Sequence, residues 1–468
     1  MKILASQRLY WQKTLPAQPW SNRMQQTPRP LTSRRTGPLT GAITPPGDKS
    51  ISHRALMLGA AATGKTVIHG LLEGEDVLNT AAAMRALGAQ ISRQTDGTWH
   101  VTGCGIGKFR ESPTTLDMGN SGTAARLLIG LLATHPIASK LDGDASLRKR
   151  PMGRVMDPLV LMGANFFSRD GGRMPLTVGG AAQPRPITYR LPVASAQVKS
   201  AILLAALNTP GATVVIEPTP TRDHSEIMLQ QFGAKLDFWT ETDGAQRITL
   251  HGPARLTGQQ VFVPADPSSA AFPMVATLLC PGSTLTLHEI GMNPRRTGLF
   301  TTLQEMGADL TMTPAAGIAG EARATIQVRA STLHGVDVPA ERAPSMIDEY
   351  PILAIAASCA TGTTRMRGLG ELRVKESDRL AMVANGLKAA GVNVVIEGDD
   401  LIVHGIGTPP AGGCTITTAM DHRIAMSFLV LGMVTPNPVT IDESGFIDTS
   451  FPGFVDLMNQ VGAQIAPV

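Results

Sequence analysis

The sequence predicts an α/β protein with a six-fold internal repeat, arranged as two similar lobes of three modules each. Two observations support this prediction. One short helix-to-strand phrase occurs six times along the chain, and two turn-rich segments bracket its first three copies. The chain has 468 residues, of which 43% are hydrophobic and 17% are charged. This gives each lobe enough apolar material for its own core and excludes a charge-rich disordered chain.

The repeated phrase consists of a helix end, a glycine, an alanine or valine, and the beginning of a strand. Its glycine occupies the position at which a helix ends in a left-handed backbone conformation, which glycine adopts most easily. One or two copies would mean nothing in an α/β protein, but six copies about 70 to 85 residues apart indicate a repeated module. The six glycines are Gly88, Gly163, Gly233, Gly307, Gly391 and Gly462.

Two segments rich in turn residues are candidate crossings between the lobes. They are PPGDKS at residues 45–50 and VPADPSS at residues 263–269. They predict a first lobe at residues 48–263 and a second lobe made of residues 38–47 together with residues 264–468. The chain then crosses between the lobes twice, and a cleft between lobes linked in this way is a natural place for a ligand.

The N-terminal segment has an unusual charge. Residues 1–47 contain seven Lys or Arg and no acidic residue, and they lack the apolar core of a secretory signal. This is typical of an organellar transit peptide, and also of translation assigned upstream of a true start such as Met24. We expect residues 1–37 to be a disordered or spurious extension. No apolar run reaches the roughly 18 residues of a membrane span, so we expect a cytoplasmic protein.

The composition argues against several partners and cofactors. The net charge is only +4 and aromatic residues make up 4%, without the basic and aromatic clusters of a nucleic-acid binder. The four cysteines, Cys104, Cys280, Cys359 and Cys414, show neither CxxC nor Cys/His ligand spacing, so no disulfide framework and no metal site are predicted. We expect a monomer with no metal, cofactor, nucleic-acid partner or membrane partner.

One segment imitates a nucleotide-binding loop. Residues 59–66, GAAATGKT, match the phosphate-loop pattern, which requires a strand before the loop and a helix after it. Here the order is reversed, because HRALMLGAAA has helical periodicity and TVIHGLL is typical of a strand. We therefore interpret Gly64 as a turn from a helix into a strand.

Cationic residues recur inside glycine- and serine-rich segments, where a solvated surface charge has no reason to lie. PPGDKSISHR and DMGNSGTAAR place such residues at predicted helix starts, where free amide groups favour an anion. Together the segments indicate a pocket for more than one phosphate or carboxylate. The other segments are GDASLRKRPMGR, LPVASAQVKSA, PTRDHSE, LRVKESDRL and DHRIAM.

These motifs, in this order, resemble the bacterial type of the 5-enolpyruvylshikimate-3-phosphate synthase family. The resemblance covers residues 38–466 and includes SMIDEYP as a further motif. It implies the enolpyruvyl transferase fold, in which each lobe has three βαβαββ-type modules. It also implies transfer of the enolpyruvyl group of phosphoenolpyruvate to the 5-hydroxyl of shikimate 3-phosphate, with release of phosphate and without a cofactor.

The resemblance also implies which residues bind the two substrates. Lys49 is implied to contact both, Ser50 and Arg54 the shikimate carboxylate, and Ser195 the shikimate phosphate. The full set implied to bind shikimate 3-phosphate is Lys49, Ser50, Arg54, Ser195, Ala196, Gln197 and Arg222. The set implied to hold phosphoenolpyruvate is Gly122, Arg150, Arg379 and Arg423.

Three residues are implied to be catalytic. The reaction adds a hydroxyl to C2 of an enol phosphate and then expels phosphate, so it needs a base, an acid that reverses its role, and stabilisation of charge. Asp348 is implied to accept the hydroxyl proton, with Lys375 beside it. Glu376 is implied to exchange a proton with the methylene carbon, and Lys49 to orient the hydroxyl and support the departing phosphate.

Two positions depart from the family pattern. Thr449 stands where some relatives have Lys, and Leu127 stands where Pro often follows the arginine of GNSGTAAR. Both concern the contact with phosphoenolpyruvate. The resemblance also implies inhibition by the analogue glyphosate, which would lie close to the backbone of Gly122.

Two alternatives remain at this point. The first is UDP-N-acetylglucosamine enolpyruvyl transferase, which shares the fold. RVKESDRL and DHRIAM favour shikimate 3-phosphate, and Cys104 is better interpreted as the end of a strand than as a reactive loop cysteine. The second is an inactive anion-binding relative, against which the retention of Lys49, Asp348, Lys375 and Glu376 argues.

Overall fold

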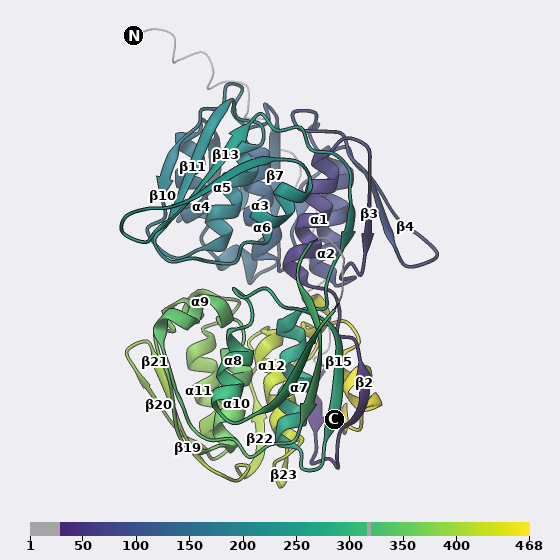
Figure 1. Ribbon diagram of the computed structural model, residues 1–468, viewed down its shortest axis with the longest axis vertical. Coiled ribbons are helices and arrows are strands. Elements are labelled where there is room, and N and C mark those ends of the chain that lie inside the picture. Colours follow the sequence, from purple (N-terminus) through teal and green to yellow (C-terminus); the bar gives the residue numbers. More distant parts are fainter. Residues whose placement is uncertain (1–28, 316–319) are drawn as a thin grey trace.

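A computed structural model of the protein describes residues 29–315 and 320–468. Figure 1 shows two lobes, one containing α1 to α6 and the other containing α7 to α12. The described residues form six four-stranded mixed sheets, three in each lobe, with helices packed against them. The predicted fold class is therefore confirmed.

Each module follows one plan of strand, helix, strand, helix, strand, strand. In the second module, β6 pairs in parallel with β7, which pairs antiparallel with β9, and β9 pairs antiparallel with β8. The second and third modules consist of β6 (Leu116–Asp117), α3 (Gly122–Leu132), β7 (Ala138–Asp142), α4 (Gly153–Leu161), β8 (Asn165–Arg169), β9 (Arg173–Gly179), β10 (Thr188–Arg190), α5 (Ala196–Ala206), β11 (Gly211–Glu217), α6 (His224–Gln231), β12 (Lys235–Thr240) and β13 (Gln246–Gly252).

The first module takes its outer strand from the far end of the lobe, since β14 pairs in parallel with β3. Its elements are α1 (Lys49–Ala61), β3 (Lys65–His69), α2 (Glu75–Ala86), β4 (Gln90–Arg93), β5 (Trp99–Thr102) and β14 (Gln260–Phe262). Gly64, at φ +86°, lies between α1 and β3. The interpretation of GAAATGKT as a helix-to-strand turn is thus confirmed.

The second lobe repeats the plan with two strands from the N-terminal region. The fourth and fifth modules consist of β2 (Thr40–Ile43), α7 (Pro267–Leu279), β15 (Thr284–Gly291), α8 (Gly298–Glu305), β16 (Asp309–Pro314), β17 (Arg323–Arg329), β18 (Asp337–Val338), α9 (Ala343–Met346), α10 (Tyr350–Cys359), β19 (Thr361–Met366), α11 (Arg379–Ala389), β20 (Asn393–Glu397) and β21 (Asp400–Ile406). The sixth consists of β22 (Gly412–Ile416), α12 (His422–Gly432), β23 (Asn437–Ile441), α13 (Phe454–Gln460), β24 (Ile465–Pro467) and β1 (Leu31–Ser33).

Strand β1 corrects the expectation for residues 1–37. It lies between β23 and β24 and pairs antiparallel with both. Its three residues are buried. A strand inside a sheet is no spurious extension, so the expectation is wrong for residues 31–33. A three-residue strand in a polar, basic context has too little hydrophobic pattern to be recognised. Residues 1–28, which include Met24, lie outside the described residues.

The six glycines of the repeated phrase behave as predicted. Their φ angles lie between +90° and +120°, the left-handed region that glycine adopts at a helix C-terminus. At each one a helix ends within two residues before the glycine and a strand begins within three residues after it. The repeat therefore marks the second helix of every module, namely α2, α4, α6, α8, α11 and α13.

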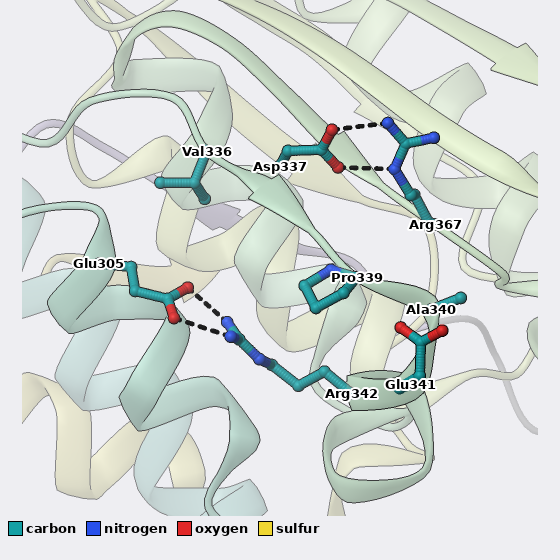
Figure 2. A pocket seen from close by; sticks show the side chains of 8 residues that line it. All are labelled: Glu305, Val336, Asp337, Pro339, Ala340, Glu341, Arg342 and Arg367. Carbon is teal, nitrogen blue, oxygen red and sulfur yellow. Dashed lines mark hydrogen bonds and ion pairs between the residues drawn. The ribbon is translucent and has the colours of Figure 1, made fainter.

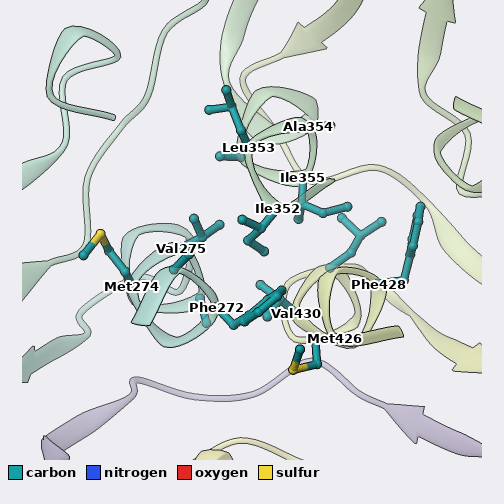
Figure 3. Close-up of a cluster of buried hydrophobic side chains, with 14 of the residues drawn as sticks. Phe272, Met274, Val275, Ile352, Leu353, Ala354, Ile355, Met426, Phe428 and Val430 are labelled. Atoms are coloured by element: carbon teal, nitrogen blue, oxygen red, sulfur yellow. The ribbon is translucent and has the colours of Figure 1, made fainter. Parts of the chain in front are cut away.

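Each lobe has its own hydrophobic core. In the second lobe, α7, α10 and α12 pack against one another, and Figure 3 shows Val275, Ile352 and Phe272 among the side chains that fill the space between them. Apolar residues surround α10 on all sides because helices and a sheet enclose it. In the described part of the chain, no helix is long and apolar enough to cross a membrane.

The chain passes between the two cores at residues 44–48 and 263–266. The two segments lie side by side, with a bridge between Gly47 and Ala265. We propose these segments as the boundaries between the lobes, so that residues 48–263 form the first lobe, and residues 38–47 with 264–468, joined by β1, form the second.

Candidate active site

A cleft of about 520 Å³ lies between the lobes and is lined by residues from both. Helices α1, α3, α5, α11 and α12 all begin at this cleft. The N-terminus of a helix offers unpaired amide groups and the positive end of the helix dipole, which favour anions. Five helix N-termini around one cleft therefore create an anion-binding environment before any side chain is considered.

All predicted site residues except Arg54 line this cleft. From the first lobe come Lys49, Ser50, Gly122, Arg150, Ser195, Ala196, Gln197 and Arg222, and from the second lobe come Asp348, Lys375, Glu376, Arg379 and Arg423. Residues that are far apart in the sequence are thus brought together at the junction of the two lobes. Their individual roles stay predictions.

Arg54 lies behind the cleft rather than in its wall. The side chain is buried, and its guanidinium donates to Ser225 Oγ at 2.8 Å, to Ser200 Oγ at 2.8 Å and to the Ser50 carbonyl at 3.0 Å. These bonds tie Arg54 to the first turn of α1 and to the serines of α5 and α6. Its implied contact with the shikimate carboxylate stays a prediction.

Asp348 lies within reach of three cations. Its carboxylate is 2.6 Å from Arg222 Nη2, 3.0 Å from Arg379 Nη1 and 3.6 Å from Lys375 Nζ. Burial alone would raise the pKa of Asp348, but Lys375, Arg222 and the neighbouring arginines outweigh burial and hold this pKa well below its usual range. Arg222 comes from the first lobe, so this cluster joins the two lobes.

Glu376 is also held by arginines from both lobes. Its carboxylate is 2.5 Å from Arg379 Nη2 and 3.6 Å from Arg150 Nη1, and Ser146 Oγ donates to its backbone carbonyl at 3.2 Å. Burial opposes ionisation, but Arg379 and Arg150 outweigh it and hold the pKa of Glu376 well below its usual range. Both predicted proton-transfer carboxylates are therefore ionised in the unliganded cleft.

Lys49 pairs with a carboxylate that the sequence prediction missed. Its Nζ lies 3.0 Å from Asp76 Oδ2, near the start of α2. Asp76 is buried, and burial raises its pKa despite Lys49. In the sequence, Asp76 looks like an ordinary acidic residue in the first turn of a helix, where the helix dipole stabilises a negative charge. Nothing in its local pattern indicates a site.

Arg126 was part of a predicted motif but had no predicted role. Its Nη1 donates to Gln197 Oε1 at 2.9 Å, and burial lowers its pKa to about 10. A Cβ atom at Gly122 would lie 2.8 Å from Arg126 Nη1 and 3.3 Å from Arg150 Nη1. The missing side chain of Gly122 therefore gives two guanidinium groups room beside the N-terminus of α3.

His422, at the start of α12, also lines the cleft. Burial, together with Lys49 and Arg423, lowers its pKa well below the usual value, so its imidazole is neutral. Its Nε2 is buried and has no hydrogen-bond partner among the described residues. The two departures from the family pattern, Thr449 and Leu127, are both buried, and neither is a lining residue of the cleft.

A second depression, of about 660 Å³, lies on the second lobe (Figure 2). Its two arginines are paired bidentately, Arg342 with Glu305 at 2.5 and 2.7 Å and Arg367 with Asp337 at 2.7 and 2.6 Å. None of the predicted site residues lines it. Among the described residues, no group of three or more His, Cys, Asp or Glu could hold a metal ion.

Two lobes of three βαβαββ modules and a cation-lined cleft between them define the enolpyruvyl transferase class. The enolpyruvyl transferase NikO from Streptomyces tendae has this fold, with a TM-score of 0.76 at 19% identity over 94% of this chain and 99% of that one. At that identity the likeness concerns the fold alone.

Closer comparisons give the family. Residues 33–458 match the family model of EPSP synthase (3-phosphoshikimate 1-carboxyvinyltransferase). The 3-phosphoshikimate 1-carboxyvinyltransferase of Paramagnetospirillum magneticum is 63% identical over 94% of this chain and 98% of its own length. That of Rhodospirillum rubrum is 61% identical over the same shares. The structure of EPSP synthase from Acinetobacter baumannii has a TM-score of 0.81 and 43% identity over 94% of this chain and 100% of that one. The chain belongs to the EPSP synthase family.

Proposed function

We propose that the protein transfers the enolpyruvyl group of phosphoenolpyruvate to the 5-hydroxyl of shikimate 3-phosphate in the cleft between its lobes. The activity is the one for which its family is named. The observation that best supports the cleft as the site is that Asp348 and Glu376 share Arg379 there, within a cluster to which both lobes contribute.

The charge of the cleft suits the two substrates. Together they bring two phosphates and two carboxylates, and the described cleft offers several cations and no metal cluster to balance them. Arginine binds such groups through two parallel hydrogen bonds and keeps its charge at any relevant pH. We assign phosphoenolpyruvate to Arg150, Arg379 and Arg423, and the phosphate of shikimate 3-phosphate to Ser195 and Arg222.

Asp348 is assigned as the base for the 5-hydroxyl. Without substrate, Arg222 and Arg379 pair with its carboxylate, and a carboxylate with such a low pKa is a weak base. When a substrate phosphate binds Arg222 and phosphoenolpyruvate binds Arg379, the two guanidinium groups must also pair with these new anions and pair less with Asp348. This raises the pKa of Asp348 and makes it a better proton acceptor at the moment when both substrates are present.

The bond changes then follow. Binding of phosphoenolpyruvate to Arg150 and Arg379 raises the pKa of Glu376 as well, so that Glu376 takes up a proton from solvent before the lobes close. As Asp348 takes the hydroxyl proton, the 5-oxygen bonds to C2 of phosphoenolpyruvate and C3 receives the proton of Glu376. The C2–O bond to phosphate then breaks, Glu376 takes a proton back from C3, and inorganic phosphate leaves beside Lys49 with the hydroxyl proton that Asp348 had accepted. Closure of both lobes on the substrates orients them and keeps water out of the reaction.

The test is release of inorganic phosphate. The proposal predicts release only when both phosphoenolpyruvate and shikimate 3-phosphate are present, and none when either is omitted. Replacing shikimate 3-phosphate by UDP-N-acetylglucosamine tests the alternative transferase. Cys104 does not favour that alternative, because it follows β5, its Sγ donates to the Ala60 carbonyl at 3.5 Å, and burial raises its pKa. No release with either acceptor would identify an inactive anion-binding relative and contradict the proposal.

A further inference from the structure

The two segments that cross between the lobes are built alike. Residues 46–48 precede α1 and residues 264–266 precede α7, and both helices have 13 residues. The segments pair through their backbones, because Asp48 N donates to the Pro264 carbonyl at 2.8 Å and Asp266 N donates to the Pro46 carbonyl at 2.9 Å. Asp48 and Asp266 are also both N-caps whose side chains accept from a backbone amide of the first helical turn, Ile51 N and Ser268 N respectively.

A single arginine lies across both caps. Arg296 Nη2 is 2.8 Å from Asp266 Oδ1 and 3.3 Å from Asp48 Oδ2, and it donates to Ser268 Oγ at 2.9 Å. All of these side chains are buried, with 5% or less of the surface of each residue exposed. Two buried carboxylates at a junction are stable only with a counter-charge. For Asp48, burial opposes ionisation, but Arg296, His224, the Ile51 N–H and Arg222 together outweigh it and lower the pKa.

The first of the two caps leads directly to Lys49. Lys49 is the first residue of α1, directly after the Asp48 cap, and its backbone N lies 3.3 Å from Asp266 Oδ2. Both caps that Arg296 holds therefore touch the residue that we assign to both substrates.

The second connection leads to Arg423. Ser268 Oγ, which accepts from Arg296, donates to Glu349 Oε1, and Glu349 lies 3.7 Å from Arg423 Nη1. Glu349 also directly follows the proposed base Asp348 in the chain. One arginine is thus joined by short polar contacts to three elements of the proposed site.

We propose that Arg296 is a positioning residue: it holds the two crossing segments together and thereby fixes Lys49 and Arg423 in the geometry that the reaction requires. The inference rests on the proposed function. The competing explanation is purely structural, in which Arg296 neutralises two buried carboxylates and stabilises the fold without affecting the reaction geometry.

The experiment compares Arg296→Met and Arg296→Lys with a matched control. The control is Arg323→Met, which removes a partly buried arginine of the same lobe that pairs with Glu289, away from the cleft. For each protein, kcat and both KM values are measured by phosphate release across a pH series, together with the melting temperature.

We expect Arg296→Met to lower kcat by about 10²-fold, the size of effect seen when reacting groups are misplaced by about an ångström. The acid limb of the kcat profile should move to higher pH, because Asp48 then takes up a proton more easily. Arg296→Lys keeps a cation, so it should return the acid limb to its original position and recover part of kcat. Arg323→Met should lower only the melting temperature.

Wild-type kcat and an unmoved acid limb in Arg296→Met, with a lowered melting temperature, would overturn the proposal. If Arg296→Met does not fold, Ser268→Ala decides. It breaks the link to Glu349 without removing a charge. A kcat that is 3- to 10-fold lower, about the contribution of one hydrogen bond, supports the proposal. An unchanged kcat overturns it. An inactive wild-type protein would instead contradict the proposed function itself.

Discussion

The cleft between the lobes and the depression of Figure 2 both contain arginines paired with carboxylates, but the pairs differ in kind. In the depression each arginine forms a bidentate pair with one carboxylate, and Arg367 also lies 3.8 Å from Asp400; Asp337 and Arg367 have 57% and 41% of their side-chain surface exposed. In the cleft, Arg379 has 1% exposed and is shared by Asp348, Glu376 and Asp421.

This difference separates a site from a surface. Exposed ion pairs are screened by water and salt and contribute little free energy. Buried charges that share partners cost desolvation energy, and they persist where function needs them. The buried, shared arginines of the cleft can exchange an internal carboxylate for a substrate anion, whereas the arginines of the depression lie in exposed pairs that water and salt screen.

The largest effect is expected for the carboxylates of the cleft. Asp348→Ala and Glu376→Gln should each fold and lower kcat by about 10² to 10⁴, the usual contribution of a general acid or base. The matched control is Asp337→Asn in the depression, which should keep wild-type kcat. Phosphate release gives kcat, and circular dichroism checks the fold. Near-wild-type turnover in either cleft variant would remove that carboxylate from the mechanism.

A second effect concerns Gly122. We expect glyphosate to inhibit the protein in competition with phosphoenolpyruvate. Gly122→Ala should weaken the binding of glyphosate by about tenfold or more relative to that of phosphoenolpyruvate. The added methyl group would lie 2.8 Å from Arg126 Nη1 and 3.3 Å from Arg150 Nη1 and would push both away. The longer ligand loses more affinity from such a shift than the shorter one. Inhibition constants measured for both proteins test this. Equal constants would mean that Gly122 does not face the bound ligand.

A third effect is the pH dependence of stability. Burial lowers the pKa of His53 to about 3 and that of His135 to about 4, from 6.5. Below pH 6.5 the unfolded chain binds protons that the folded protein does not, so the free energy of unfolding falls as pH decreases from 6.5 to 4, by about 1.4 kcal/mol per pH unit for each histidine. Urea unfolding at several pH values measures the slope. His53→Asn should reduce it, and an unchanged slope would contradict a neutral buried His53.

The smallest effect is expected in the depression. Asp337→Asn and Arg367→Gln each remove one exposed ion pair, and the free energy of unfolding should change by no more than about 1 kcal/mol. High salt should reduce even this difference. A larger loss of unfolding free energy, measured by urea unfolding, would show that these exposed ion pairs stabilise the fold as strongly as buried ones.

Much of the fold could be predicted because it repeats. The glycine phrase marks the second helix of all six modules, since a left-handed helix end is a local requirement that each module meets with the same residue. Strand β1 could not be predicted in this way, because it completes the sixth sheet from the opposite end of the chain. Such a pairing depends on tertiary contacts and not on local pattern.

A site residue could be predicted from the sequence when a recognisable motif contains the residue that lines the cleft. Lys49, Arg150 and Arg379 lie in glycine- or serine-rich segments and line it. Arg54 lies in such a motif too, but its guanidinium is used by Ser200 and Ser225, and no motif indicates which way a side chain points. Arg296 has no motif, and its place between Asp48 and Asp266 arises only when the two crossings meet.

A crystal structure with bound shikimate 3-phosphate would show directly whether Arg222 and its neighbours exchange the Asp348 carboxylate for a substrate anion. We predict that the phosphate lies within hydrogen-bond distance of Ser195 and Arg222, and that the contact of 2.6 Å between Arg222 and Asp348 lengthens or is shared. A phosphate bound outside the cleft, or an Arg222 that remains on Asp348 alone, would contradict the account.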